Sequence, residues 1–411
     1  MKILLVNDEF PPYVYGGSAI VVYDLAKKLK DLGHEVAVIT TIQKEKENLN
    51  DEYDGIKTAR IKSDYNLKFR SYVSIYNLST VYKFRKILKE FKPDIVHFHN
   101  VHAWLSYYTI KIAKKSGARV FLTAHDSMLF HYGKFTEYID KKNREIVKKF
   151  NYRLSAWPLI KRFRWQYNPL RNYAIRHYIG YCDKIFCISF ALKQALSSNK
   201  ICNVEVIHNG IDADSWQPDQ AKVNEFKIKF NLSGKRIILF CGRASYLKGT
   251  WFLLQSQILV RKKIKNAVLV FVTDMTEHTA YLSEEAAKYG AEVVVTGWLD
   301  REWIKAAYHS SDVVVVPSIY LDPFVLVNIE AMASKKPVVG TCFGGTPEII
   351  EDGKTGYIVN PLNTEDMAEK IIRLLEDEKK SEQLGFEGYK RVKEYFSHDK
   401  KVMQLLNYYQ K

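Results

Sequence analysis

VVVVPSIYLDPFVLVNIEAMA, residues 313–333, contains the pattern that decides the fold of this 411-residue chain. Four consecutive valines closed by Pro317 predict a short, buried parallel strand that ends abruptly. Asp322 and Glu330 follow, eight positions apart, across a loop and the first turns of a predicted helix. Open α/β sheets bind their ligands at this carboxyl end of a strand. Because carboxylates accept hydrogen bonds from diols and helix N–H groups favour anions, the segment predicts a site for a sugar nucleotide.

The first half of the chain alternates strand and helix signals. Helices are expected over residues 18–32 and 103–116, and each is followed by a glycine, Gly33 or Gly117, which favours a helix end. Such alternation predicts a parallel sheet with helices on both faces. The strands expected in this half cover residues 3–7, 35–40, 94–99, 119–124, 184–189 and 204–208.

The second half repeats this plan after a polar stretch. Residues 214–234, with Pro218 and Ser233-Gly234, predict a linker. We therefore expect two domains, residues 1–213 and 214–395. The strands expected in the second half cover residues 236–241, 267–272, 292–296, 312–316, 337–340 and 357–359, and the helices cover residues 250–260, 301–309, 328–333 and 366–376.

A longer motif extends the opening segment. An acidic residue, seven further residues, a glutamate, Ala-Met-Ala and then Pro-Val-Val follow one another between residues 322 and 339. This pattern closely resembles the donor-site signature of the retaining GT-B glycosyltransferases of family 4. The resemblance implies an α/β GT-B fold, with two Rossmann-like domains whose parallel sheets face each other across a cleft. It also implies a C-terminal helix, about residues 396–411, that packs on the first domain.

The resemblance also gives roles to the two acids and the two domains. In that family the first acid binds hydroxyls of the donor sugar and the second binds the nucleotide ribose, and by position these roles fall on Asp322 and Glu330. Without the surrounding motif, the pair would be interpreted as a solvated loop acid and a helix-capping acid. The family places the acceptor in the first domain, residues 1–213, and the nucleotide-sugar donor in the second, residues 214–395.

Two turns are candidates for binding phosphate. Gly16 and Gly17 lie between the first strand and the first helix, where glycine permits close approach and the helix start is electropositive. Arg243 and Lys248, five residues apart at a strand-to-helix turn, can hold a diphosphate and stabilise its developing charge without a metal. Alone, these features also fit an ordinary turn and a surface pair. The resemblance places both beside the donor phosphates and makes Arg243 and Lys248 catalytic.

Two aromatic residues at strand ends receive roles from the resemblance. His125 follows an apolar strand and precedes Asp126. The family implies that its ring or main-chain carbonyl faces the donor sugar and steadies an oxocarbenium-like transition state, whereas a capping histidine is the alternative. Trp298 follows Gly297, where the family binds the nucleotide base, so it is expected either to stack on that base or to belong to the core.

The chain departs from the family pattern at three positions between residues 322 and 335. Asp322 stands where a glutamate is usual, and Val325 and Lys335 stand where glycine is usual. Phe324, Val325 and Leu326 lie where backbone amides approach the sugar hydroxyls in the family, so they complete the expected donor site. These departures bear on the choice of sugar and keep open the interpretation of a catalytically weak relative.

The net charge of +16 is concentrated between Lys134 and Arg176, with twelve Lys and Arg against three Asp and Glu. Basic heads among aromatic rings suit the headgroup zone of an anionic membrane, although a merely solvated basic surface is the alternative. Nucleic acid is an improbable partner, because no helix-turn-helix, zinc-finger or RNA-binding signature accompanies the charge. The interleaved aromatic residues are Tyr152, Trp157, Phe163, Trp165, Tyr167 and Tyr173.

No metal site and no membrane span are expected. His97, His99 and His102 are closely spaced, but no carboxylate lies near them in sequence. The five cysteines form no CxxC pair, which indicates reduced thiols in a cytosolic protein. The chain starts with a strand pattern and not a signal peptide, and no stretch approaches ~18 apolar residues. We therefore expect a cytoplasmic protein that can associate with the inner face of the membrane.

Together these patterns predict a retaining, metal-independent hexosyltransferase that needs no cofactor. It would move a sugar from a UDP or GDP conjugate to a glycan or lipid-linked acceptor, in the synthesis of surface polysaccharides or glycoconjugates. Three alternatives stay open. They are a sugar-nucleotide epimerase or phosphorylase of the same fold, a non-catalytic subunit that binds sugar nucleotides, and a basic nucleic-acid binder.

Overall fold

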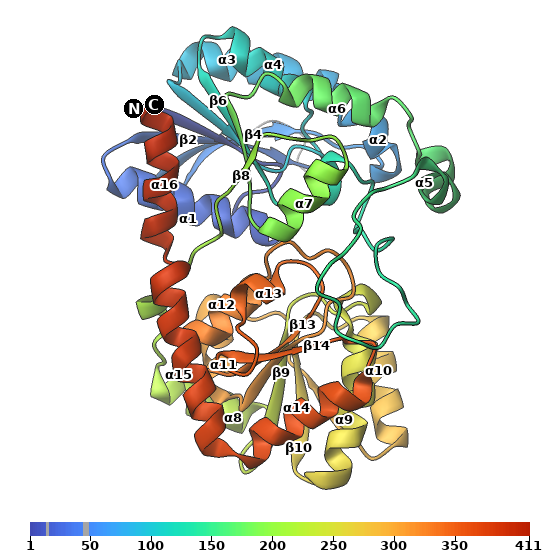
Figure 1. The fold of residues 1–411 in the computed structure, drawn as a ribbon. Helices are drawn as coiled ribbons and strands as arrows, with labels where there is room; N and C mark the ends of the chain where they lie inside the picture. The colour runs from blue at the N-terminus through green and yellow to red at the C-terminus, as the bar shows by residue number, and fades with distance from the viewer. Residues whose placement is uncertain (14–15, 44–48) are drawn as a thin grey trace. The chain divides into compact units, whose positions relative to one another are not determined.

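The computed structural model describes residues 1–13, 16–43 and 49–411, which form two compact units (Figure 1). The expected boundary lay between residues 213 and 214, whereas the structure divides the chain after His208 and also gives residues 138–151 to the second unit. Unit 1 comprises Met1–Glu137, Tyr152–His208 and Lys401–Lys411, and unit 2 comprises Tyr138–Asn151 and Asn209–Lys400.

Unit 1 is built on a sheet in which the described strands follow the order β3-β4-β2-β1-β5-β6-β7-β8. The six strands expected in the first half are confirmed within two residues at each end. The prediction missed β3 and β4, an antiparallel hairpin around Asp54 and Gly55 at the edge of the sheet. The strands are β1 (Lys2–Val6), β2 (Glu35–Ile42), β3 (Leu49–Tyr53), β4 (Ile56–Lys62), β5 (Ile95–Phe98), β6 (Arg119–Ala124), β7 (Lys184–Cys187) and β8 (Val204–Val206).

The helices of unit 1 pack apolar residues against this sheet. Leu25 and Leu29 of α1, for example, share a core cluster with Ile3 and Leu5 of β1. The helix expected over residues 103–116 is shorter than predicted, because its first turns are replaced by a loop. The helices are α1 (Gly17–Asp31), α2 (Arg70–Val73), α3 (Leu78–Phe91), α4 (Tyr108–Lys115), α5 (Ala156–Phe163), α6 (Arg171–Ile179) and α7 (Phe190–Ser198).

The end of the last helix, α16 (His398–Gln410), belongs to unit 1 from Lys401 onward. The Tyr409 hydroxyl bonds to Nδ1 of His97 on β5. Arg119 on β6 donates to the carbonyl oxygens of Tyr408 and Tyr409 at 3.1 and 2.8 Å. The expectation that the C-terminal helix packs with the first domain is therefore confirmed.

Unit 2 contains a parallel sheet whose described strands follow the order β11-β10-β9-β12-β13-β14. All six strands expected here are confirmed within one residue. The chain builds outward from β9 to β11 and then returns to place β12 on the other side of β9. The junction between β9 and β12 is the topological switch point, where doubly wound sheets bind ligands. The strands are β9 (Arg236–Cys241), β10 (Ala267–Val272), β11 (Glu292–Val295), β12 (Val313–Val316), β13 (Val338–Thr341) and β14 (Gly356–Val359).

The predicted linker in residues 214–234 is wrong, because these residues contain helix α8. Asp219 caps it by accepting from two backbone N–H groups, and Val223 and Phe226 are buried. Phe226 lies 6.2 Å from Trp303, ring centroid to ring centroid. The helices of unit 2 are α8 (Gln220–Lys229), α9 (Thr250–Lys263), α10 (Glu277–Lys288), α11 (Arg301–Ser310), α12 (Leu326–Ala333), α13 (Thr346–Ile349), α14 (Thr364–Glu376) and α15 (Glu378–Tyr395).

The basic segment between Lys134 and Arg176 does not lie on one unit. Residues 138–151, which contain five of its twelve basic residues, belong to unit 2. Residues 152–176 belong to unit 1 and contain six basic residues and no acid. Throughout residues 1–13, 16–43 and 49–411, no helix combines the length and the apolar character that a membrane crossing requires.

Candidate active site

The switch point of unit 2 brings together two residues that the sequence singled out. Lys248 follows β9 and Asp322 follows β12, and Lys248 Nζ donates to Asp322 Oδ2 at 2.7 Å. The same carboxylate oxygen accepts from the hydroxyl of Tyr320 at 2.7 Å and from that of Ser318 at 3.3 Å. Asp322 is only 7% exposed. A charged pair therefore stands at the end of the sheet, held in place by two hydroxyl groups.

Electrostatics keep Lys248 protonated beside Asp322. Burial lowers the pKa of Lys248, but the adjacent Asp322 and Tyr320 outweigh burial and hold that pKa above its usual value. Burial, together with the charge of Asp322, raises the pKa of the Tyr320 hydroxyl. Lys248 is thus an ammonium and Tyr320 a neutral donor at physiological pH.

Two glycines allow the loops to close around Asp322. Gly249 has φ +75°, and a Cβ added there would lie 1.9 Å from the carbonyl oxygen of Pro317. Gly344 has φ +69°, and its Cβ would lie 2.2 Å from the carbonyl oxygen of Asp322. Only glycine tolerates both the backbone conformation and the contact. The glycines of Lys248-Gly249 and Gly344-Gly345 that contact these loops therefore have a structural reason in unit 2.

Glu330 on α12 lies at the same edge of the sheet, with a partner that sequence reasoning missed. Its Oε2 accepts from the hydroxyl of Tyr308 on α11 at 2.7 Å. Burial, the Cys241 thiol and Glu330 together raise the pKa of Tyr308, so its hydroxyl stays protonated. Burial and Glu330 raise the pKa of the Cys241 thiol to about 12. Tyr308 fixes one carboxylate oxygen of Glu330.

The remaining predicted donor residues lie around the start of α12 and on nearby loops. Phe324 and Val325 are buried, and Leu326 is half-buried as the first residue of α12. Val325 has φ −82°, so the exchange of the family glycine for valine causes no backbone strain there. Arg243 is exposed. Trp298 is 60% exposed, which excludes the alternative that it is a core tryptophan.

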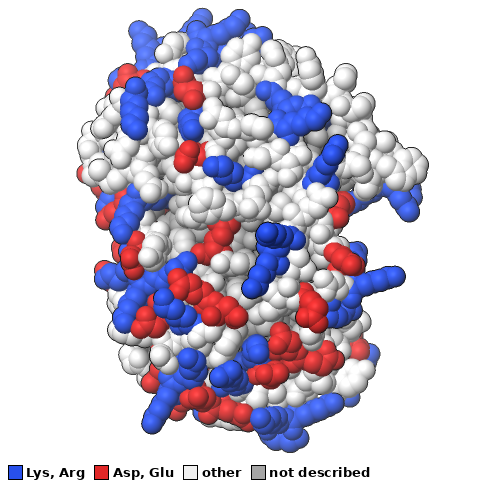
Figure 2. All heavy atoms as spheres, viewed as in Figure 1, with Lys and Arg blue, Asp and Glu red and all other residues white. Residues whose placement is uncertain are grey.

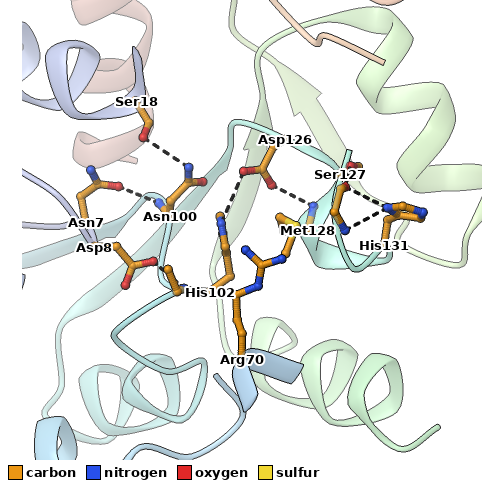
Figure 3. A network of polar contacts seen from close by, with 12 residues as sticks. Asn7, Asp8, Ser18, Arg70, Asn100, His102, Asp126, Ser127, Met128 and His131 are labelled. Carbon is orange, nitrogen blue, oxygen red and sulfur yellow. Dashed lines mark hydrogen bonds and ion pairs between the residues drawn. The ribbon is translucent and has the colours of Figure 1, made fainter. Parts of the chain in front are cut away.

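In unit 1, a polar network joins the loops after β1, β5 and β6 (Figure 3). Asp8, which the sequence analysis missed, accepts from the backbone N–H groups of Ala103, Trp104 and Leu105 at 2.7, 2.9 and 2.7 Å. These bonds hold residues 103–105 in a loop and explain why α4 begins late. Burial raises the pKa of Asp8 to about 7, although the three N–H groups oppose that rise.

His125 lies in this region and is buried. Its Nε2 is 2.8 Å from Nδ1 of His99, so one ring donates to the other. Burial lowers the pKa of both histidines well below the usual value, with a further contribution from Lys401. His99 Nε2 has no hydrogen-bond partner within the described part of the chain. His125 is therefore a neutral imidazole oriented by a second one, and not a helix cap.

The neighbouring residues Asp126 and His102 form a separate pair. Asp126 accepts from the backbone N–H of Met128 at 2.8 Å and lies 3.7 Å from His102 Nε2 (Figure 3). Burial lowers the pKa of His102 to about 4, against the effect of Asp126. Within residues 1–13, 16–43 and 49–411, no three His, Cys, Asp or Glu side chains gather in a way that could hold a metal ion.

Gly16 precedes α1 with extended backbone, φ −148°. A Cβ added to Gly16 would meet only an ordinary contact, 3.7 Å from Glu9 Oε2. Neither the conformation nor the packing of the described residues requires glycine at this position. Gly17 is exposed as the first residue of α1. The two residues that precede Gly16 lie outside the described part of the chain.

Comparisons with known proteins agree with the geometry. The family model for glycosyl transferases group 1 matches residues 222–391, and that for glycosyltransferase family 4 matches residues 15–215. An uncharacterized glycosyltransferase of Methanocaldococcus jannaschii is 30% identical over 100% of this chain and 98% of its own length. Spore coat protein SA of Bacillus subtilis is 26% identical, with 100% of both chains covered.

Solved structures share the fold at low sequence identity. Sucrose-phosphate synthase from Thermosynechococcus elongatus superposes with a TM-score of 0.74 at 20% identity, covering 100% of this chain and 98% of the other. Anabaena HepE in complex with UDP-glucose gives a TM-score of 0.71 at 17% identity, covering 99% and 98%. The two parallel-sheet units are thus the Rossmann-like domains of a GT-B fold, and the chain belongs to the glycosyl transferases of group 1 and is a glycosyltransferase.

Proposed function

We propose that this enzyme transfers a sugar from a nucleoside diphosphate sugar, with retention and without a metal, to an acceptor bound by unit 1. The observation that carries the proposal is the Lys248–Asp322 pair at the switch point of unit 2, 2.7 Å apart and enclosed by glycine loops. A sugar diphosphate offers hydroxyls to the carboxylate and phosphate oxygens to the ammonium, so it suits both members of the pair.

The roles of the other residues follow from their chemistry. Arg243 is exposed, and its planar guanidinium suits the binding of a diphosphate together with Lys248. Preorganised cations of this kind stabilise a leaving diphosphate, so no metal and no carboxylate pair of glycosidase type is needed. The oriented ring of His125 suits a contact with the sugar. Packing does not require glycine at Gly16, which fits a role beside the phosphates, and the exposed ring of Trp298 suits a contact with the base.

UDP conjugates are the first donors to test, because Anabaena HepE was crystallised with UDP-glucose. Thermal unfolding would be followed with UDP, GDP and ADP and with their sugar conjugates, without added metal and again with EDTA. A ligand at 100 times its dissociation constant should stabilise the protein by roughly 2.7 kcal/mol. Arg243→Ala should lose this shift, whereas Lys262→Ala, which removes an exposed cation from α9, should retain it.

The products distinguish glycosyl transfer from its rivals. Incubation with the stabilising donor and candidate acceptors should yield a glycosylated product with the donor's anomeric configuration, observable by NMR. An epimerised sugar nucleotide would indicate an epimerase, and a free sugar phosphate would indicate a phosphorylase. A nucleotide that stabilises the protein but yields no product with any acceptor would favour a non-catalytic binding subunit.

The face of unit 1 that carries α5 favours an acceptor at a membrane surface. Trp157 is 73% exposed, and Trp165, Phe69 and Tyr72 are about half exposed. The rings of Phe69 and Trp165 are 5.6 Å apart, and the Tyr72 hydroxyl donates to the Trp165 carbonyl at 3.0 Å. We call these four residues the aromatic face. Aromatic rings beside basic residues suit an anionic leaflet, so we propose a lipid-linked acceptor in surface polysaccharide or glycoconjugate synthesis.

A further inference from the structure

A pocket in unit 1 is lined by basic residues from separate parts of the chain. Lys68 lies just before α2, Arg70 is the first residue of α2, and Arg171 is the first residue of α6. No acidic residue lines this pocket within the described part of the chain. The other lining residues are Leu67, Ser71, Met128, Tyr132 and Gln166.

Arg171 is the unusual member of this set, because it is only 1% exposed. Its Nη2 donates to the Met128 carbonyl at 2.5 Å and its Nη1 to Asn172 Oδ1 at 2.9 Å, and its guanidinium lies 4.9 Å from the centre of the Tyr132 ring. Both acceptors are neutral. Across residues 1–13, 16–43 and 49–411, no carboxylate forms an ion pair with Arg171. Because buried charges in proteins are normally paired, a buried guanidinium whose hydrogen-bond acceptors are neutral is suited to bind an anion.

Arg70 approaches the same pocket and adds to the excess charge. Its Nη2 donates to the Tyr132 carbonyl at 2.7 Å, so it too has a neutral partner. Burial and the charge of Arg70 lower the pKa of Arg171, whereas Tyr107, Tyr132 and Asp126 act in the opposite direction. Asp126 is the nearby carboxylate. It accepts from the Met128 N–H, lies 3.7 Å from His102 Nε2, and Figure 3 shows Arg70 beside these two residues. Two guanidiniums and an ammonium thus line one pocket with no acidic residue among its described lining, and the single carboxylate of Asp126 nearby offsets only part of their charge.

We infer that this pocket binds a phosphate group carried by the acceptor, so that the enzyme glycosylates phosphorylated molecules. This inference rests on the proposed function and names its acceptor class. Each guanidinium has five N–H donors, and the two hydrogen bonds of Arg171 described above use two of them, so donors remain for phosphate oxygens. A doubly charged phosphate neutralises more of this cluster than a carboxylate, and the planar guanidinium matches its oxygens.

Direct binding tests the inference. Isothermal titration and thermal unfolding would use glucose 6-phosphate, a soluble phosphomonoester, with glucose as the uncharged control at matched ionic strength. We expect the wild type to bind glucose 6-phosphate and not glucose. Arg70→Gln should weaken binding at least tenfold, as should Lys68→Gln. Lys83→Gln, which removes an exposed cation from α3 of the same unit, should leave binding unchanged.

A second arm identifies the source of the phosphate. Vesicles of phosphatidylcholine with phosphatidic acid present the same phosphomonoester on a lipid, and vesicles with phosphatidylserine present equal charge without it. The pocket would be assigned to a lipid phosphate if the wild type prefers phosphatidic acid, does not bind glucose 6-phosphate, and loses this preference in Arg70→Gln. The reverse result would assign it to a soluble sugar phosphate.

The outcome that overturns the inference is equal behaviour of the wild type and Arg70→Gln towards both probes. That failure is separable from failure of the proposed function, because stabilisation by a sugar nucleotide depends on unit 2. Arg243→Ala should retain phosphate binding in unit 1, and Arg70→Gln should retain the response to the nucleotide. A wild type that responds to nucleotide but not to phosphate would refute only the acceptor class.

Discussion

The two units share one architecture but differ in charge. Unit 1 contains 32 Lys and Arg against 17 Asp and Glu, whereas unit 2 contains 30 against 29, so 15 of the 16 net positive charges lie in unit 1. Figure 2 shows the two signs intermingled over unit 2 and few acidic side chains on the visible face of unit 1.

The difference indicates how each unit recognises its ligand. In unit 2, a single cation, Lys248, is placed against Asp322 at the end of one strand, so recognition depends on a few oriented contacts. In unit 1, the long-range field is positive, and Arg70 and Arg171 have neutral partners. A balanced surface with a local pair suits a defined small donor, whereas an excess of charge attracts anionic partners from a distance.

The largest expected effect is in unit 2. Lys248→Ala removes the ammonium from the donor site and should reduce glycosyl transfer about 10²- to 10³-fold, the usual loss for one electrostatic stabiliser. It should also lower stability, because Asp322 stays buried without its counter-charge. Arg243→Ala should lose activity but keep the wild-type stability. The checks are steady-state rates and urea unfolding, and wild-type rates in both variants would refute the assignment.

The next effect tests an ion pair that unit 1 does contain. Glu137 lies 2.7 Å from Arg162 Nη1 and 3.2 Å from His131 Nε2. Burial alone would raise its pKa, but His131 and Arg162 outweigh burial and lower the pKa of Glu137 to about 2. Such a depressed pKa stabilises the fold above the unfolded value of 4.5, by roughly 1–2 kcal/mol once solvent screening of this half-buried group is included, and this contribution is lost as the pH falls towards 2.

Glu137→Gln should therefore lower the free energy of unfolding near neutral pH, and its difference from the wild type should narrow below about pH 4.5. Urea unfolding at several pH values measures this. Glu90→Gln is the matched control, since it removes an exposed partner of Lys86 on α3, 3.8 Å away, and should change stability by less than about 1 kcal/mol. A difference that stays constant with pH would contradict the lowered pKa.

A pair of exposed tryptophans separates the surfaces of the two units. Trp157→Ala in unit 1 should weaken binding to phosphatidylglycerol vesicles about tenfold, a loss of about 1.4 kcal/mol, and leave nucleotide binding unchanged. Trp298→Ala in unit 2 should do the opposite, since a base stacked on an aromatic ring contributes roughly 1–3 kcal/mol. Vesicle sedimentation and nucleotide titration of both variants give the answer. If each variant weakened binding to vesicles and to nucleotide equally, the two units would not have separate binding surfaces.

The same contrast explains what could be predicted from the sequence. In unit 2, the decisive residues lie in the loops that follow strands, and parallel strands end at a common edge, so the motif led to Lys248 and Asp322. The prediction missed Tyr308, because nothing in its own helix marks it as the partner of Glu330. It missed α8 because only Val223 and Phe226 anchor an otherwise polar helix.

In unit 1, the important residues come from segments that only the tertiary fold brings together. Arg70 and Arg171 meet at Tyr132, far from both in sequence, and no local pattern links the three. His99 was noticed only for its spacing from its neighbours, although its partner is His125. The β3–β4 hairpin had a recognisable Asp54-Gly55 turn, but its polar edge strand shows no alternation of apolar residues.

The smallest effect concerns a departure from the family pattern at the end of α12. Lys335 has φ +56°, a left-handed conformation that glycine adopts without cost and that other residues adopt with strain. Its N–H bonds to the Met332 carbonyl at 3.0 Å, as the residue that ends a helix does. The lysine offsets part of this strain through a contact of its Nζ with the Tyr389 ring, at 5.1 Å.

Lys335→Gly should therefore raise the free energy of unfolding by about 1 kcal/mol, measured by urea unfolding. Lys335→Ala is the matched control, because it removes the ring contact and keeps the strain, so it should destabilise. Glycosyl transfer should stay at the wild-type rate in both variants, since the strain lies at the carboxyl end of α12, away from Asp322. A change of donor preference in Lys335→Gly would instead show that this residue shapes the donor site. Donor recognition in unit 2 would then depend on residues beyond the local Lys248–Asp322 pair.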